Sequence, residues 1–150
     1  MKTSVTLFFA ILFFSGCGDD PKKNSPQKSE LAKIENWARP GVQGQMSGAY
    51  FVYRNPLSIA DTLISVYSPQ AMMTQIHESY TTEDDLAGMR EKAEIIVQAN
   101  QNITLEQGGL HVMLMNLKTD LQEPDSVTIS LIFNQAGKVD LTLPVISNKK

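Results

Sequence analysis

The second half of the chain alternates apolar and polar residues with a period of two. The alternation runs over residues 127–133 and returns over residues 139–145. A period of two is typical of a β-strand that is buried on one face, whereas an amphipathic helix repeats every 3.6 residues. Residues 134–138 include Gly137, so we expect the two runs to form a β-hairpin.

Shorter runs of the same kind occur throughout the region that begins at Met46. Pro56, Pro69 and Pro124 interrupt them and mark turns. Short strands at this spacing predict an antiparallel β-sandwich or a small barrel, and therefore an all-β fold. The further strands are expected at 49–53, 62–67, 73–80, 94–97, 102–106 and 110–116.

Residues 1–16 have the features of a secretory signal peptide. Lys2 precedes an apolar stretch over 5–14, and two small residues end the segment. The stretch is too short for a transmembrane helix. Cys17, the only cysteine of the chain, follows directly, and this placement resembles a bacterial lipobox whose cysteine is lipidated. Phe14 stands where that pattern usually has leucine, and the alternative is an ordinary cleaved signal that leaves a free thiol.

The polar segment 17–36 is expected to be a flexible tether between the lipidated cysteine and a folded domain over 37–147. Removal of 1–16 takes away one of the 13 basic residues and none of the 16 acidic ones, so the mature protein is mildly acidic. We expect no nucleic-acid binding, since no basic patch with interleaved aromatic residues is present. We expect membrane contact through the lipid alone. Gly18 after the cysteine lacks the aspartate of an inner-membrane retention signal, which favours the outer membrane of a two-membrane cell.

The two histidines of the chain both lie near methionines. His111 opens the run His-Val-Met-Leu-Met that ends at Met115, and Met89 lies between His77 and this run. Imidazole nitrogens and thioether sulfurs suit Cu(I), whereas hard cations such as Mg²⁺ prefer oxygen. The sequence therefore suggests a copper-binding protein.

Strand geometry predicts which of these side chains share a face. On one strand His111, Met113 and Met115 project together, while Leu110, Val112 and Leu114 project into the core. Gln75 and Met73 share the face of His77, and Met89 follows a polar segment, 81–88, that is expected to be a loop. Spacing alone leaves a second interpretation open, in which the methionines pack in the core and the histidines are solvated or hydrogen-bonded.

The segment Gly108-Gly109-Leu110-His111-Val112-Met113-Leu114-Met115, with the following Asn116-Leu117-Lys118, resembles the signature of the PCuAC family of periplasmic copper chaperones. Trp37-Ala38-Arg39-Pro40, Gly48-Ala49-Tyr50 and His77-Glu78 are similar to that family too, and the likeness covers 37–145. It implies a cupredoxin-like, antiparallel Greek-key β-sandwich or barrel. It implies Cu(I) bound by His77, Met89, His111 and Met113, with Met115 as an auxiliary ligand. It also implies delivery of copper towards the dinuclear copper centre in cytochrome c oxidase subunit II, alongside a Sco-type protein.

The sequence departs from the family pattern around the first histidine. Family members often have methionine where this chain has Glu78, and the 81–88 segment carries Glu83, Asp84 and Asp85. A proline that is common shortly after the second ligand is absent here. Either Met89 or Met115 could therefore complete the site.

Three other functions were weighed against a copper carrier that is not an enzyme. A lipid-anchored adaptor would bind a protein partner and use Met and His only for packing. An enzyme with Ser79 and His77 as nucleophile and base would lack an oriented triad. A blue-copper electron carrier would need a cysteine ligand in the domain. Release of copper by ligand exchange requires access, so we expect His111 and Met113 near the surface, at one end of the sandwich.

Overall fold

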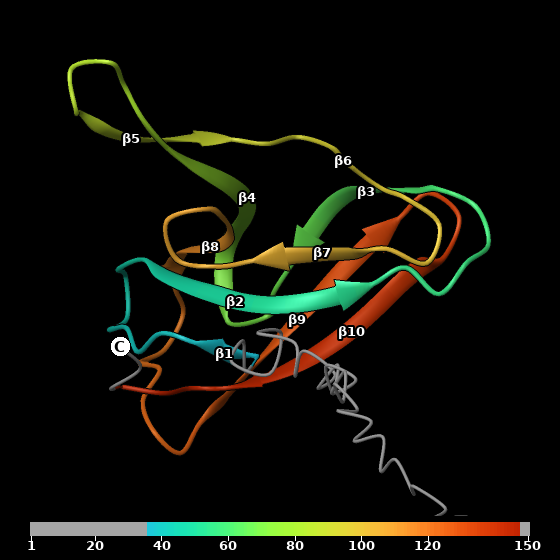
Figure 1. The fold of residues 1–150 in the computed structure, drawn as a ribbon. Coiled ribbons are helices and arrows are strands. Elements are labelled where there is room, and N and C mark those ends of the chain that lie inside the picture. The colour runs from blue at the N-terminus through green and yellow to red at the C-terminus, as the bar shows by residue number, and fades with distance from the viewer. Residues whose placement is uncertain (1–35, 148–150) are drawn as a thin grey trace, which may run out of the picture.

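The alternating runs of the sequence form strands that pack as two antiparallel sheets (Figure 1). The structure is a computed structural model and describes residues 36–147. The expected signal peptide, Cys17 and the tether up to residue 35 lie outside this range. Within the described range, no helix is long and apolar enough to cross a membrane.

One sheet contains the strands that carry the histidines. Its strand order begins with β1 and ends with β5, and β7 pairs with the far half of β2. In this order the strands are β1 (Trp37–Ala38), β2 (Ser47–Arg54), β8 (Leu110–Leu117), β4 (Ala71–Thr81) and β5 (Ala87–Glu91), with β7 at Asn102–Leu105. The central position of β8, between β2 and β4, places His111 and Met113 in the middle of the sheet.

The second sheet covers the inner face of the first. Its order is β10 (Gly137–Pro144), β9 (Ser126–Phe133), β3 (Asp61–Tyr67) and β6 (Ile95–Val97). The strands β9 and β10 form the predicted hairpin, with Phe133 opposite Gly137, whose φ of 72° suits glycine at this turn. The all-β sandwich expected from the sequence is confirmed.

The core lies between the two sheets, as the alternation requires. Val112 and Leu114 from β8 and Ile129 and Leu131 from β9 are inaccessible to solvent. The division predicted for β8 is confirmed, because Val112 and Leu114 are fully buried while the intervening Met113 is not. The outer face of the first sheet is therefore free to carry a site.

Two strands were missed from the sequence. β1 is only two residues long, and Trp37 there is buried by stacking on Tyr50, with ring centroids 4.7 Å apart. The expected loop 81–88 was wrong in part, because β4 continues to Thr81 and β5 begins at Ala87. β5 is an edge strand with no buried residue, so it lacks the alternation that revealed the others. Figure 1 shows the β4–β5 hairpin reaching beyond the sandwich.

Candidate metal centre

The strand register brings the two histidines together. His77 on β4 and His111 on β8 are directly opposite each other, and their ring centroids are 6.1 Å apart in an edge-to-face arrangement. Imidazole nitrogens lie about 2 Å from a bound metal ion, so two rings at this separation can reach one ion. The structure thus gives a specific geometry to residues that are 34 positions apart in sequence.

The same register places two methionines on the face of the histidines. Met113 lies opposite Gln75 on β4, and Met89 on β5 lies opposite Ser79. Side chains directly across neighbouring antiparallel strands point to the same face. Residues that the sequence predicted as ligands from three segments therefore share one face of three adjacent strands.

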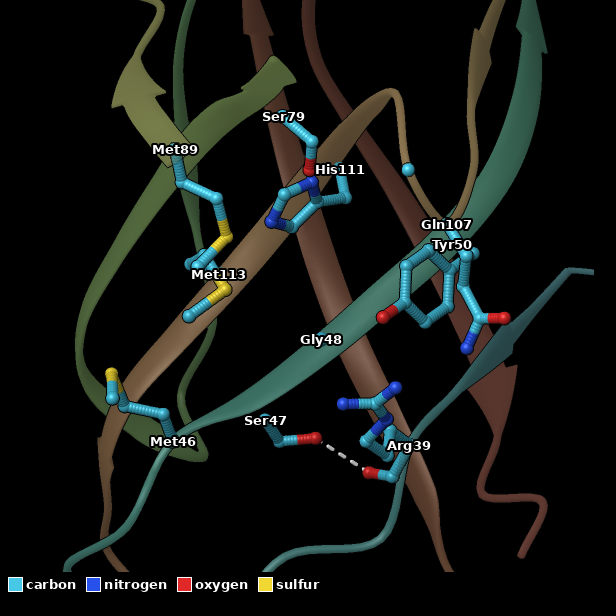
Figure 2. A pocket seen from close by; sticks show the side chains of 11 residues that line it. Arg39, Met46, Ser47, Gly48, Tyr50, Ser79, Met89, Gln107, His111 and Met113 are labelled. Carbon is cyan, nitrogen blue, oxygen red and sulfur yellow. Dashed lines mark hydrogen bonds between the residues drawn. The ribbon is translucent and has the colours of Figure 1, made fainter. Parts of the chain in front are cut away.

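A cavity of about 510 Å³ opens on this face (Figure 2). Figure 2 shows the sulfur atoms of Met89 and Met113 on the same side of the ring of His111. His77 lies next to the cavity and does not line it. The lining residues are Arg39, Met46, Ser47, Gly48, Tyr50, Ser79, Met89, Gln107, Gly108, His111 and Met113.

A backbone carbonyl fixes the orientation of His111. The Nδ1 atom of His111 is 3.0 Å from the carbonyl oxygen of Gly109, which also accepts the amide of Ser79 at 3.1 Å. A carbonyl can only accept, so Nδ1 carries the proton and Nε2 keeps a free lone pair. The preceding Gly108 has φ of 80°, a conformation that glycine adopts without strain. The turn that contains the two glycines therefore orients His111.

His77 has a nitrogen that is buried and unsatisfied. Its Nε2 lies 3.2 Å from Oε1 of Gln75, which assigns the proton to Nε2. Its Nδ1 is buried and has no hydrogen-bond partner among residues 36–147. Buried polar atoms in proteins are nearly always paired, and an exception calls for an explanation. A neutral imidazole with one nitrogen left free, beside thioethers, fits a soft cation such as Cu(I).

The surroundings keep His77 neutral. Burial lowers the pKa of His77, and the neighbouring His111 lowers it further, while Glu91, directly across on β5, opposes the shift. The charged form is disfavoured because burial removes its hydration. At neutral pH the ring is therefore in the protonation state that binds metal.

The thioethers differ in their access to solvent. Met89 is 58% exposed, whereas Met113 is half-buried. Met115 shares their face but lies outside the cavity, opposite Met73. The cavity includes one methionine that sequence analysis missed, Met46, which is 62% exposed. Met46 lies two residues before Gly48, and Gly48 is opposite Met113. Only the pairing register of β2 with β8 brings Met46 near the site, and this register cannot be read from the spacing of residues in the sequence.

The expectation that His111 lies near the surface holds only in part, because His111 lines the cavity and is itself buried. Its side chain is only 5% exposed, because the 106–109 turn carries the carbonyl that binds it and the ring of Tyr50 lies 6.3 Å away. The Tyr50 hydroxyl in turn occupies the space above Gly48, where a Cβ atom would lie 2.7 Å from it. Access to the centre is therefore through the methionine side of the cavity.

Glu78, which follows His77 on β4, points away from the histidines. Its carboxylate accepts two hydrogen bonds from Arg90 on β5 at 2.7 and 2.9 Å, and Arg90 also lies over the ring of Tyr80. The bonds from Arg90 hold the pKa of Glu78 below its usual range. The pair lies on the opposite face from Met89 and ties β5 to β4.

Comparison with known sequences gives a family match over most of the chain. Residues 32–145 match the family described as "Putative lipoprotein LpqE-like". The uncharacterized protein RP573 of Rickettsia prowazekii is 25% identical over 113 residues, covering 73% of this chain and 62% of that protein. "Putative lipoprotein Lxx21020" of Leifsonia xyli is 26% identical over 109 residues, covering 73% of this chain and 65% of that protein. The chain thus spans less than two thirds of the length of these relatives.

Comparison with solved structures shows the same fold. The copper-bound PCuAC domain from PmoF2 superposes with a TM-score of 0.59 at 22% identity, covering 77% of this chain and 92% of that domain. The Cu(I) form of DR1885 from Deinococcus radiodurans gives a TM-score of 0.58 at 22% identity, covering 87% of both chains. The chain shares with these domains a sandwich of two antiparallel sheets.

Proposed function

The chain belongs to the LpqE-like lipoprotein family and has the fold of PCuAC copper-chaperone domains, and from this premise we propose that it is a Cu(I) metallochaperone of the cell envelope. The observation that carries the proposal is the free Nδ1 of His77, buried beside His111 and unpaired within residues 36–147. Met89 and Met113 add the soft sulfur donors. The proposed ligands are His77, Met89, His111 and Met113, with Met115 as an auxiliary position.

The proposed ligands suit a carrier that must release its cargo. Thioethers bind Cu(I) without losing a proton, and they form no disulfides in an oxidising compartment. His111 is held by the Gly109 carbonyl, whereas Met89 lies exposed on an edge strand. A sulfur ligand of an acceptor would therefore displace Met89 first and would bind the ion before the histidines dissociate from it. Transfer by such exchange needs no turnover chemistry, which agrees with a protein that is not an enzyme.

We place the acceptor at the dinuclear copper centre of cytochrome c oxidase subunit II, with a Sco-type protein as an intermediate partner. Support comes from the resemblance of the 108–118 segment to the PCuAC signature. A lipid on Cys17 would hold the domain at a membrane surface, and the family description as a lipoprotein supports this anchor. Gly18 is the residue that favours the outer membrane in this proposal.

The experiment is an anaerobic competition titration of the full chain, purified in detergent, against a chromophoric Cu(I) chelator. We expect one tight equivalent that His111→Ala weakens by more than about a hundredfold, since loss of supporting residues alone costs about 10- to 100-fold. Met89→Leu should weaken it by about tenfold or more, and Met115→Leu should have a smaller effect. Wild-type binding no stronger than that of His111→Ala would disprove the proposal and favour a lipid-anchored adaptor.

A further inference from the structure

Five methionines gather on the outer face of the six-stranded sheet, more than the proposed site uses. Met89 and Met113 are sulfur ligands of that site, and Met115 is its auxiliary position. Met115 also lies in one row with Met46 and Met73 across three adjacent strands. Met73 on β4 lies opposite Met115 on β8, and the register that pairs Ser47 with Leu114 places Met46 beside Met115 when it continues by one residue.

Packing does not explain this row. Met46 is 62% exposed and Met73 is 52% exposed, so neither fills the core, which is the usual role of methionine. Met115 between them is half-buried, because its strand lies at the centre of the sheet. The row thus presents three thioethers to solvent from neighbouring positions on one surface.

The spacing of the row suits a single soft ion. Opposite residues on adjacent strands have Cβ atoms about 5 Å apart. Three sulfurs that each bind one ion at about 2.3 Å lie about 4 Å from one another. Methionine has three rotatable side-chain bonds, so the outer two side chains can converge above the central one.

We propose that Met46, Met73 and Met115 form a second Cu(I) site, built from thioethers alone, which loads the cavity. This inference rests on the proposed function for its cargo, because Cu(I) is the ion that neutral sulfur ligands select. Met46 also lines the cavity that contains Met113 and His111. An ion can therefore pass from the row to the histidine site while at least one methionine sulfur stays bound. Without nitrogen ligands the row binds more weakly than the histidine site and fills second.

The test is a titration of the full chain in detergent with Ag(I), a redox-inert substitute for Cu(I), followed by NMR of ¹³C-methyl-labelled methionines. We expect the Met89 and Met113 methyl signals to shift with the first equivalent, and those of Met46, Met73 and Met115 with the second. Met73→Leu should weaken the second equivalent by at least about tenfold and change the first by less than about threefold. Met72→Leu is the matched control. Met72 is 67% exposed and adjacent to Met73, but alternation along β4 directs its side chain to the opposite face.

The outcomes separate this inference from the proposed function. A single equivalent that leaves the Met73 and Met115 signals unmoved overturns the second site and leaves the chaperone proposal standing. Met46 shifting together with Met113 in the first equivalent also overturns it, since Met46 then belongs to the histidine site. In the double variant His77→Ala, His111→Ala, retention of one sulfur-only equivalent supports the second site. If wild type and this double variant bind Ag(I) and Cu(I) alike, the histidine site fails and the row alone binds metal.

Discussion

In the four-stranded sheet, the buried carboxylate of Asp61 accepts backbone amides from Thr62, Gln135 and Ala136 at 2.8–2.9 Å. In the six-stranded sheet, Nδ1 of His77 is also buried and accepts nothing from residues 36–147. The Asp61 carboxylate pairs with amides of the β9–β10 turn that have no other partner in the sheet, so it stabilises the fold. His77 keeps a lone pair available at the cost of some stability. Of two buried polar groups, the unsatisfied one indicates the binding site.

The two groups also differ in the origin of their protonation states. Burial by itself would raise the pKa of Asp61, but the amides of Ala136, Gln135 and Thr62 outweigh it and hold the pKa of this carboxyl below its usual range. The pKa of His77 is lowered chiefly by burial. Asp61 is thus charged because it is bound, whereas His77 is neutral because it is desolvated.

A core variant gives the scale for the comparison and the largest expected loss. Leu131 is fully buried between the sheets. Leu131→Ala should lower the unfolding free energy by about 2–5 kcal/mol, because the residues around the resulting cavity lose packing contacts. Urea denaturation followed by circular dichroism measures this loss. Cu(I) affinity of the folded protein should stay within about threefold of wild type, and a larger drop would show that the two faces of the first sheet are coupled.

Asp61→Asn should give the second largest effect, a loss of about 1–3 kcal/mol of unfolding free energy, because an amide is a poorer acceptor than a carboxylate for these backbone N–H groups. The pH dependence has a definite sign. Since the folded pKa of Asp61 is lowered, its contribution to stability is complete above the unfolded pKa, which is about 3.9. That contribution falls away as the pH drops below this value towards the folded pKa. Urea midpoints measured from pH 7 to pH 3 should converge for wild type and variant, and parallel curves would contradict this account.

Glu78→Gln should destabilise less than Asp61→Asn, because the ion pair with Arg90 lies largely in solvent. The expected result is a small decrease in the melting temperature that disappears in 1 M salt, where such pairs are screened. Arg90→Gln is the matching control, and the double variant should be no less stable than either single change. A decrease in the melting temperature that persists in high salt would mean that the Glu78–Arg90 pair stabilises the fold by more than charge attraction.

The smallest stability change is expected for His77→Leu, which sharpens the contrast with Asp61 most. Removing a polar atom that has no partner removes its desolvation cost, so the unfolding free energy should stay within about 0.5 kcal/mol of wild type. Cu(I) binding should nevertheless be lost in the competition titration. If the variant instead unfolds as readily as Asp61→Asn, then His77 is a structural residue and the comparison fails.

Sequence reasoning succeeded where the information is local. The alternation within β8 separated His111 and Met113 from Val112 and Leu114 because a strand directs neighbouring residues to opposite faces. Gly137 marked the turn of the β9–β10 hairpin for a similarly local reason. Such patterns depend only on backbone geometry, which each segment carries by itself.

The features that the sequence did not predict depend on pairing between distant segments. Met46 was not predicted as a residue of the cavity because only the β2–β8 register brings it near Met113. The burial of His111 was missed because the ring of Tyr50, which lies close to it, belongs to β2. The choice between Met89 and Met115 stayed open for the same reason, since β5 has no alternation to reveal it as a strand that pairs with β4.

The stacking of Trp37 on Tyr50 has a practical consequence for every titration described above. Trp37 is the single tryptophan of the chain, and the Tyr50 ring against which it stacks lies 6.3 Å from the His111 ring. The protein therefore has one dominant fluorophore, and a single aromatic ring, that of Tyr50, separates it from the proposed ligand His111. We expect its emission to report occupancy of the histidine site without a dye or a label, so that delivery to an acceptor can be followed in real time.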